Sequence, residues 1–269
     1  MTVALTGDDL TLAYDSRTIS ASLDVEIPHG EVTVIVGPNG CGKSTLLRAL
    51  SRLIAPQRGR VLLDGDDIRR MGGKQFARRL ALLPQSSQAP SGISVGDLVA
   101  RGRYPHQRML QQWSADDEGA VRRAMAATDV EGLADRGVEE LSGGQRQRVW
   151  IAMLLAQDAP VMLLDEPTTF LDVAHHLDVL DLVARLNRDE GRTLVLVLHD
   201  LNQAARFADH LVVMRDGAIA ARGRPSEILT EQLLADVFAL DARVIPDPVF
   251  GTPLVVPIAS RKELRDHDA

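Results

Sequence analysis

A glycine-rich stretch that ends in lysine and serine carries the strongest chemical signal in the chain. Residues 37–45 match the phosphate-binding pattern G-x-x-x-x-G-K-[ST]. Glycines let the backbone wrap so that its N–H groups face phosphate oxygens, and a helix after the loop directs its positive end at the same anion. We expect Lys43 to reach the β- and γ-phosphates of a nucleotide and the Ser44 hydroxyl to ligand Mg²⁺. The predicted nucleotide-binding residues of this loop are Gly37, Pro38, Asn39, Gly40, Cys41, Gly42, Lys43, Ser44 and Thr45.

Two carboxylates follow a short apolar run at residues 161–164. A buried strand here would present Asp165 at its polar end, where the carboxylate could hold Mg²⁺ directly or through water. Glu166 comes one residue later and could polarise the water that attacks a γ-phosphate. Together with the phosphate loop, this pair predicts an ATP-hydrolysing site.

The string Leu-Ser-Gly-Gly-Gln at residues 141–145 opens a strongly patterned helix, expected from Arg146 to Gln157. Ser142 is a natural N-cap, and the two glycines expose backbone N–H groups to an anion. In a chain with both nucleotide motifs, this string resembles the signature of ABC-type ATPases. The resemblance implies a head-to-tail homodimer in which the signature contacts the γ-phosphate held by the partner's phosphate loop. The signature residues carried over are Ser142, Gly143, Gly144 and Gln145.

The resemblance assigns four further residues, in the order that the family has them. Gln85 is similar to the glutamine that contacts Mg²⁺ and the attacking water, and Asp172 to the aspartate at the dimer seam. His199 is similar to the histidine that contacts the γ-phosphate, and Tyr14 to the aromatic residue that stacks on adenine. The expected catalytic set is Glu166, His199, Gln85 and Lys43, and the expected metal ligands are Ser44, Gln85 and Asp165.

The elements that must position these residues read as an α/β fold. Short apolar runs such as Val32–Val36 and Leu194–Leu198 alternate with helical segments, which predicts a mostly parallel sheet covered on both faces. Antiparallel strands are expected up to about residue 25, and the prolines after residue 241 favour an extended surface tail over a helix.

The resemblance implies an ABC-type P-loop NTPase with a RecA-like parallel-sheet core, an N-terminal antiparallel β-subdomain and an inserted α-helical subdomain. We expect residues 1–85 and 158–240 to form the catalytic core, residues 86–157 the helical subdomain with the signature helix, and residues 241–269 a C-terminal tail.

Composition narrows the class of function. The 269 residues are 45% hydrophobic and carry a formal net charge of −7, so general binding to nucleic acid is not expected. No apolar stretch approaches the roughly 18–20 residues that span a bilayer, and the N-terminus lacks the features of a signal peptide. The resemblance then implies a peripheral subunit on the cytoplasmic face of the inner membrane. Its partners would be integral-membrane permease subunits and, indirectly, an extracytoplasmic substrate-binding protein.

Several stretches resemble a narrower group of ABC ATPases, those of importers for ferric siderophores, haem and cobalamin. One departure from many ABC proteins is Thr-Phe-Leu-Asp at residues 169–172 in place of Ser-Ala-Leu-Asp, a variation that is familiar among siderophore-type subunits. The stretches that carry this resemblance are residues 101–106, 167–172, 198–204 and 247–257.

We therefore expect an ATPase subunit that powers uptake of an iron chelate, with a ferric siderophore ahead of haem or cobalamin. The alternatives are the detached ATPase of an exporter and a soluble ABC protein of translation or DNA maintenance. Against the last, the chain has one set of motifs, and about a hundred residues without sustained heptads or cysteine pairs separate the phosphate loop from the signature.

Overall fold

The computed structural model describes residues 2–15, 17–107, 113–168 and 171–260. These fall into two compact units, one formed by residues 1–69 and 195–269 and the other by residues 70–194. The subdomain limits expected from the sequence at residues 86, 157 and 241 remain predictions.

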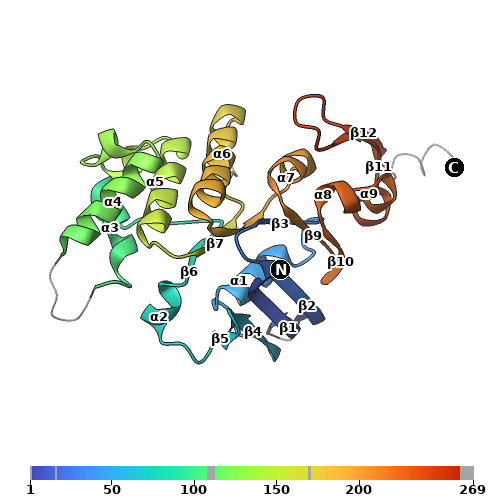
Figure 1. The fold of residues 1–269 in the computed structure, drawn as a ribbon, viewed down its shortest axis with the longest axis horizontal. Helices are drawn as coiled ribbons and strands as arrows, with labels where there is room; N and C mark the ends of the chain where they lie inside the picture. Colours follow the sequence, from blue (N-terminus) through green and yellow to red (C-terminus); the bar gives the residue numbers. More distant parts are fainter. Residues whose placement is uncertain (1, 16, 108–112, 169–170, 261–269) are drawn as a thin grey trace. The chain divides into compact units, whose positions relative to one another are not determined.

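The first unit contains a four-stranded antiparallel sheet in the order β2-β1-β4-β5 (Figure 1). Strands β1 and β2 form a long hairpin in which inward apolar residues alternate with exposed polar ones, the pattern of a sheet with one buried face. This confirms the antiparallel strands predicted for the N-terminal stretch. The strands are β1 (Val3–Tyr14), β2 (Arg17–Pro28), β4 (Arg58–Leu63) and β5 (Asp66–Asp67).

The same unit holds the strand that leads into the phosphate loop. Strand β3 (Val32–Val36) is buried at every position, as expected for a strand covered on both faces, and it pairs in parallel with β9 (His210–Arg215). Strand β10 (Ala218–Gly223) pairs antiparallel with β9. Helix α1 (Lys43–Leu50) follows the loop and buries most of its residues.

The C-terminal stretch of the first unit is a hairpin, and not only an extended tail. Strands β11 (Leu240–Pro246) and β12 (Pro253–Ser260) pair antiparallel, and β12 contacts helix α7 (Leu201–Phe207) (Figure 1). The side-chain amide of Asn202 fastens this contact. Its Nδ2 donates to the Val255 carbonyl at 3.2 Å, and the Val255 N–H donates to Asn202 Oδ1 at 2.7 Å. Helices α8 (Pro225–Ile228) and α9 (Glu231–Phe238) precede the hairpin.

The second unit combines two parallel strands with most of the helices. Strand β6 (Leu80–Leu83) pairs in parallel with β7 (Val161–Asp165), and both are apolar and mostly buried. Helix α4 packs along α5 (Figure 1). Helix α5 begins at Gly143, three residues before the predicted start, because the Ser142 cap admits both glycines into its first turn. The helices are α2 (Gly73–Ala77), α3 (Val95–Ala100), α4 (Ala115–Ala127), α5 (Gly143–Ala156) and α6 (Val173–Glu190), with 3₁₀ turns η1 (Arg101–Arg103), η2 (Glu131–Leu133) and η3 (Val138–Glu140).

One of the stretches used for the subgroup resemblance, residues 101–106, anchors the helices of this unit to each other. Arg103 Nε donates to Asp117 Oδ1 on α4 at 2.8 Å, and Arg103 Nη1 donates to the Ala156 carbonyl at the end of α5 at 2.9 Å. Both charged side chains are more than nine-tenths buried. A Cβ on Gly102 would lie 2.2 Å from a carbonyl of α5, so only glycine fits there. This stretch therefore has a structural role in packing.

Strand β8 (Thr193–Val197) belongs to neither unit alone, since the division falls between Leu194 and Val195. Parallel strands with intervening helices confirm the predicted α/β class. Within the described part of the chain, no helix has both the length and the apolar character needed to cross a membrane.

Candidate functional site

The phosphate loop connects β3 to α1, as its sequence predicts. Gly42 is the N-cap of α1 with a φ of 107°, in the left-handed region that disfavours side chains. At Gly37 a Cβ would lie 2.3 Å from the Met214 carbonyl on β9, so this position has no room for one. Gly42 is thus required by its backbone angle, and Gly37 by the close approach of strand β9.

The Lys43 side chain bends back over its own loop. The residue is only 5% exposed, and its Nζ donates to the Gly37 carbonyl at 2.8 Å and to the Pro38 carbonyl at 3.0 Å. An ammonium group has three protons, so these two bonds hold the charge at the loop and leave a third donor. A fixed cation among backbone N–H groups is suited to a phosphate.

Cys41 fills the interior of the loop. It is 4% exposed, and its Sγ lies 2.7 Å from the position that a Gly37 Cβ would take. Burial raises the pKa of the Cys41 thiol above its ordinary value, despite the Lys43 charge nearby. A thiol that stays protonated is a weak nucleophile, so this environment favours a packing role.

Tyr14 and His199 lie in the same unit as the loop. Tyr14 ends β1, and its hydroxyl accepts a hydrogen bond at 3.1 Å from Arg48 Nη1 on α1, the helix that follows the loop. His199 follows β8 at an exposed position, and the preceding Leu198 N–H donates to the Ile35 carbonyl on β3 at 3.3 Å. His199 and the phosphate loop therefore both follow segments that are hydrogen-bonded to each other.

In the second unit, Gln85 and Glu166 meet although 81 positions separate them. Gln85 Nε2 donates to Glu166 Oε2 at 2.8 Å. Asp165 is the last residue of β7 and is 3% exposed, whereas Glu166 lies just beyond the strand with a φ of 52°. A left-handed non-glycine residue costs about 1–3 kcal/mol and is typical of functional sites. The contact brings two of the predicted catalytic residues together.

The signature opens α5 with a capping box. Ser142 Oγ accepts from the Gln145 N–H at 3.2 Å, and Gln145 Oε1 accepts from the Ser142 N–H at 3.2 Å. The expected N-cap role of Ser142 is thereby confirmed. Because both side chains are used inside the box, the first-turn N–H groups of Gly143 and Gly144 are the groups best suited to an external anion.

Asp172 caps α6 and holds a histidine that the sequence analysis did not select. Asp172 Oδ1 accepts from the His175 backbone N–H at 2.9 Å and pairs with His175 Nδ1 at 2.7 Å. These hydrogen bonds lower the pKa of the Asp172 carboxyl group. The spacing of three residues after an aspartate N-cap was the available signal. Residues 169 and 170 of the same motif lie outside the described part of the chain.

The predicted metal ligands are a hydroxyl, an amide and a carboxylate, on Ser44, Gln85 and Asp165. All are oxygen donors, the kind that Mg²⁺ prefers, and few protein ligands suffice because this ion keeps several waters and substrate oxygens. Among the residues that the structure describes, no group of three or more His, Cys, Asp or Glu gathers around a common point. The chemistry of the hydroxyl, amide and carboxylate donors fits Mg²⁺ bound with a nucleotide.

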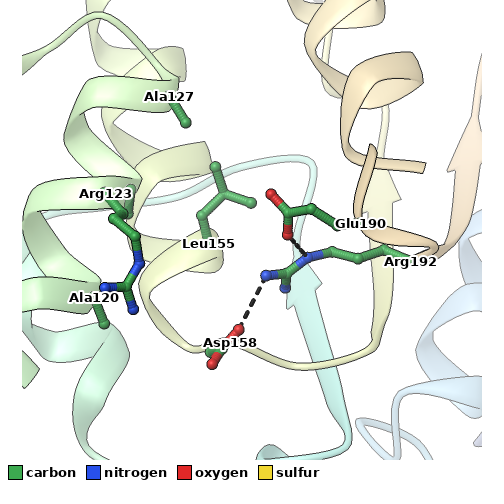
Figure 2. Close-up of a pocket in the computed structure, with 8 residues that line it drawn as sticks. Ala120, Arg123, Ala127, Leu155, Asp158, Glu190 and Arg192 are labelled. Carbon is green, nitrogen blue, oxygen red and sulfur yellow. Dashed lines mark hydrogen bonds and ion pairs between the residues drawn. The ribbon is translucent and has the colours of Figure 1, made fainter. Parts of the chain in front are cut away.

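A separate cavity of about 300 Å³ lies in the second unit against α4 and the end of α5 (Figure 2). Arg192 lines one wall, and its guanidinium group donates to Asp158 Oδ1 at 3.0 Å and to Glu190 Oε2 at 2.6 Å. These pairs tie Arg192, just before β8, to the end of helix α6 and to the turn after helix α5. None of the predicted nucleotide-binding residues lines this cavity, so it is not the candidate site.

Comparisons with known proteins indicate the family of this chain. A family model described as ABC transporter matches residues 21–169. The ferric enterobactin transport ATP-binding protein of Escherichia coli (strain K12) is 55% identical over 94% of each chain. The achromobactin transport ATP-binding protein of Dickeya dadantii (strain 3937) is 54% identical over 96% of each chain.

Among solved structures, a metal-chelate type ABC transporter in an inward-facing conformation matches with a TM-score of 0.82. Its identity to this chain is 28%, and the match covers 98% of this chain and 100% of that one. The match confirms the fold that the sequence predicted.

Proposed function

This chain belongs to the ABC transporter family of ATP-binding proteins, and we propose that it is the ATP-hydrolysing subunit of an importer for a ferric siderophore. The observation that carries the proposal is the identity of 54–55% over almost the whole length of two transport ATPases that are named for siderophores. Haem and cobalamin importers remain outcomes of the test below.

The reaction is attack of water on the γ-phosphate of ATP, with release of ADP and phosphate. Lys43 and the N–H groups of its loop bind the phosphates, and Glu166 accepts a proton from the attacking water. The hydrogen bond at 2.8 Å from Gln85 orients the Glu166 carboxylate. Catalysis of this kind consists mainly of positioning and charge neutralisation.

Ser44, Gln85 and Asp165 would hold Mg²⁺ together with the nucleotide. When bound, the ion neutralises charge on the phosphate oxygens. The place of Asp165 as the last residue of β7 supports this role, because a carboxylate at the end of a strand can bind Mg²⁺ directly or through water.

Two copies would form the working unit, each lending its signature, Ser142–Gln145, to the site of the other. His199 would sense the γ-phosphate, and Asp172 would lie at the seam. The pair of subunits would sit at the cytoplasmic face of the membrane against separate permease subunits, with an extracytoplasmic binding protein delivering the solute. ATP binding would close the pair, and hydrolysis would reopen it.

The test compares Glu166→Gln with Glu227→Gln. Both replace a carboxylate by an amide, but Glu227 lies exposed on α8, away from the proposed chemistry. In purified protein, Glu166→Gln should bind ATP and lose turnover by about 10²–10⁴-fold, the usual contribution of a general base. Glu227→Gln should keep the wild-type rate. Normal turnover by Glu166→Gln would refute the assignment of Glu166.

Uptake in cells that carry only the Glu166→Gln subunit then identifies the solute. Radiolabelled ferric siderophores, haem and cobalamin are supplied in parallel, with Glu227→Gln cells as the control. Selective loss of ferric siderophore uptake is the expected result. Normal siderophore uptake with a defect for haem or cobalamin would move the proposal to that solute.

A further inference from the structure

The His175 side chain is held at one end by the aspartate that caps its own helix. Asp172 Oδ1 lies 2.7 Å from His175 Nδ1 and 2.9 Å from the His175 backbone nitrogen. A carboxylate on Nδ1 fixes the plane of the imidazole ring, in the way that such partners orient catalytic histidines. The ring can therefore act as a rigid extension of Asp172.

The other end of the ring lies against the signature helix. A Cβ built on Gly144 would be 3.0 Å from His175 Cδ2 and 3.2 Å from Cγ. Such distances are tighter than ordinary contacts, so a side chain at position 144 would require the His175 ring to shift by a few tenths of an ångström.

We propose that His175 is a positioning residue that couples the Asp172 loop to the first turn of the signature helix. This inference rests on the proposed function, in which both elements act at the seam with a second copy. One imidazole touches both, through a hydrogen bond to Asp172 and a packing contact with Gly144. The first turn of α5 and the cap of α6 are thus held at a fixed separation within each subunit.

A capping role alone does not explain the ring. The helix cap uses the backbone N–H of residue 175, which any residue except proline supplies. Loss of the ring should therefore leave α6 capped and the chain folded, while the coupling is lost. Since the coupling concerns the signature and not the phosphate loop, we expect a lower kcat for ATP hydrolysis with an unchanged KM for ATP.

Two substitutions separate the two contacts of the ring. His175→Phe keeps a ring against Gly144 and loses the hydrogen bond to Asp172, and His175→Asn keeps a side-chain donor and loses the ring. Each should lower kcat by about tenfold, within the range of couplings between residues in contact, and leave KM for ATP within about twofold. Val173→Ala, an exposed change in the same turn, is the matched control and should keep the wild-type kcat.

A double-mutant cycle tests the contact with Gly144 directly. Gly144→Ala places a methyl group against the ring, whereas His175→Ala with Gly144→Ala gives that methyl group room. The double variant should retain a higher kcat than Gly144→Ala alone. The inference would be overturned if the effects of Gly144→Ala and His175→Ala on kcat simply multiplied. Wild-type kcat in either His175→Phe or His175→Asn would also overturn it.

Failure of the positioning role of His175 can be distinguished from failure of the proposed function. If Glu166→Gln hydrolyses ATP normally, the proposed function fails whatever His175 does. If Glu166→Gln is inactive while both His175 variants match wild type in kcat, only the positioning role fails. Thermal unfolding of every variant checks that the fold is kept, and a loss of kcat that follows the loss of stability in both His175 variants would also overturn the role.

Discussion

The buried ion pair between Arg103 and Asp117 gives a stability prediction whose size follows from the structure. The two side chains are 8% and 9% exposed, and Arg103 also donates to the Ala156 carbonyl. Arg103→Met would leave the Asp117 carboxylate buried without its cation. Removing one partner of a buried pair costs about 3–5 kcal/mol. Ser114 still donates to Asp117 through its hydroxyl at 2.7 Å, so we expect the lower end, about 3 kcal/mol.

Denaturant unfolding followed by circular dichroism measures this loss, and thermal unfolding should show a lower Tm by about 6–12 °C, at about 2–4 °C per kcal/mol for a chain of this size. The matched control is Arg136→Met, which breaks an exposed pair with Glu140 whose side chains are 45% and 59% exposed. That change should lower the free energy of unfolding by less than about 1 kcal/mol.

A second variant shows whether the uncompensated charge of Asp117 causes the loss of stability in Arg103→Met. Asp117→Asn keeps an oxygen that accepts from Ser114 and removes the charge, so Arg103→Met with Asp117→Asn should be more stable than Arg103→Met alone. If Arg103→Met costs no more than the exposed control, the reasoning from burial is wrong. The same conclusion follows if neutralising Asp117 restores nothing.

Two further predictions concern acid stability and the C-terminal hairpin. Burial raises the pKa of Asp117, but hydrogen bonds from Ser114 and Arg103 outweigh it, so the pKa is lowered on folding. Its contribution to stability is then present above the unfolded pKa of about 3.9 and is lost as the pH falls through the lower folded value. Unfolding titrations of Asp117→Asn should therefore show a shallower loss of stability below about pH 4 than wild type, and equal slopes would contradict this. Asn202→Ala leaves the buried Val255 N–H without its acceptor and should cost about 1–3 kcal/mol, while hydrogen exchange at Val255 becomes faster. Unchanged exchange there would show that Asn202 does not hold the hairpin.

Most strands could be predicted from the sequence, because buried parallel strands are short, apolar and bounded by turn residues. The run at Val32–Val36 matches β3 at both ends. Helix α5 was placed three residues late, since two glycines read as a loop until the Ser142 cap is considered. The hairpin was missed because prolines argue against strands, although strands with open edges tolerate them. Pro246 and Pro253 face each other at the end of this hairpin.

The residues of the candidate site could be selected from motifs, but their contacts could not. Nothing in the sequence states that Gln85 donates to Glu166, since that depends on β6 and β7 being neighbours. No sequence motif selects His175. The contact between His175 and Gly144 depends on how two helices pack, which single-sequence periodicity does not encode.

The two hydrogen bonds between Asn202 and Val255 have a consequence for truncated chains. Every motif used to recognise the ATPase lies at or before His199, and the family model matches only residues 21–169. The segment directly after His199 is nevertheless held by strand β12, because Asn202 bonds to Val255, which lies 53 positions further along the chain. A gene with a premature stop codon before β12 would still encode every nucleotide-binding and catalytic motif. Its product would be counted as intact by motif searches, while the helix behind His199 would lack its support.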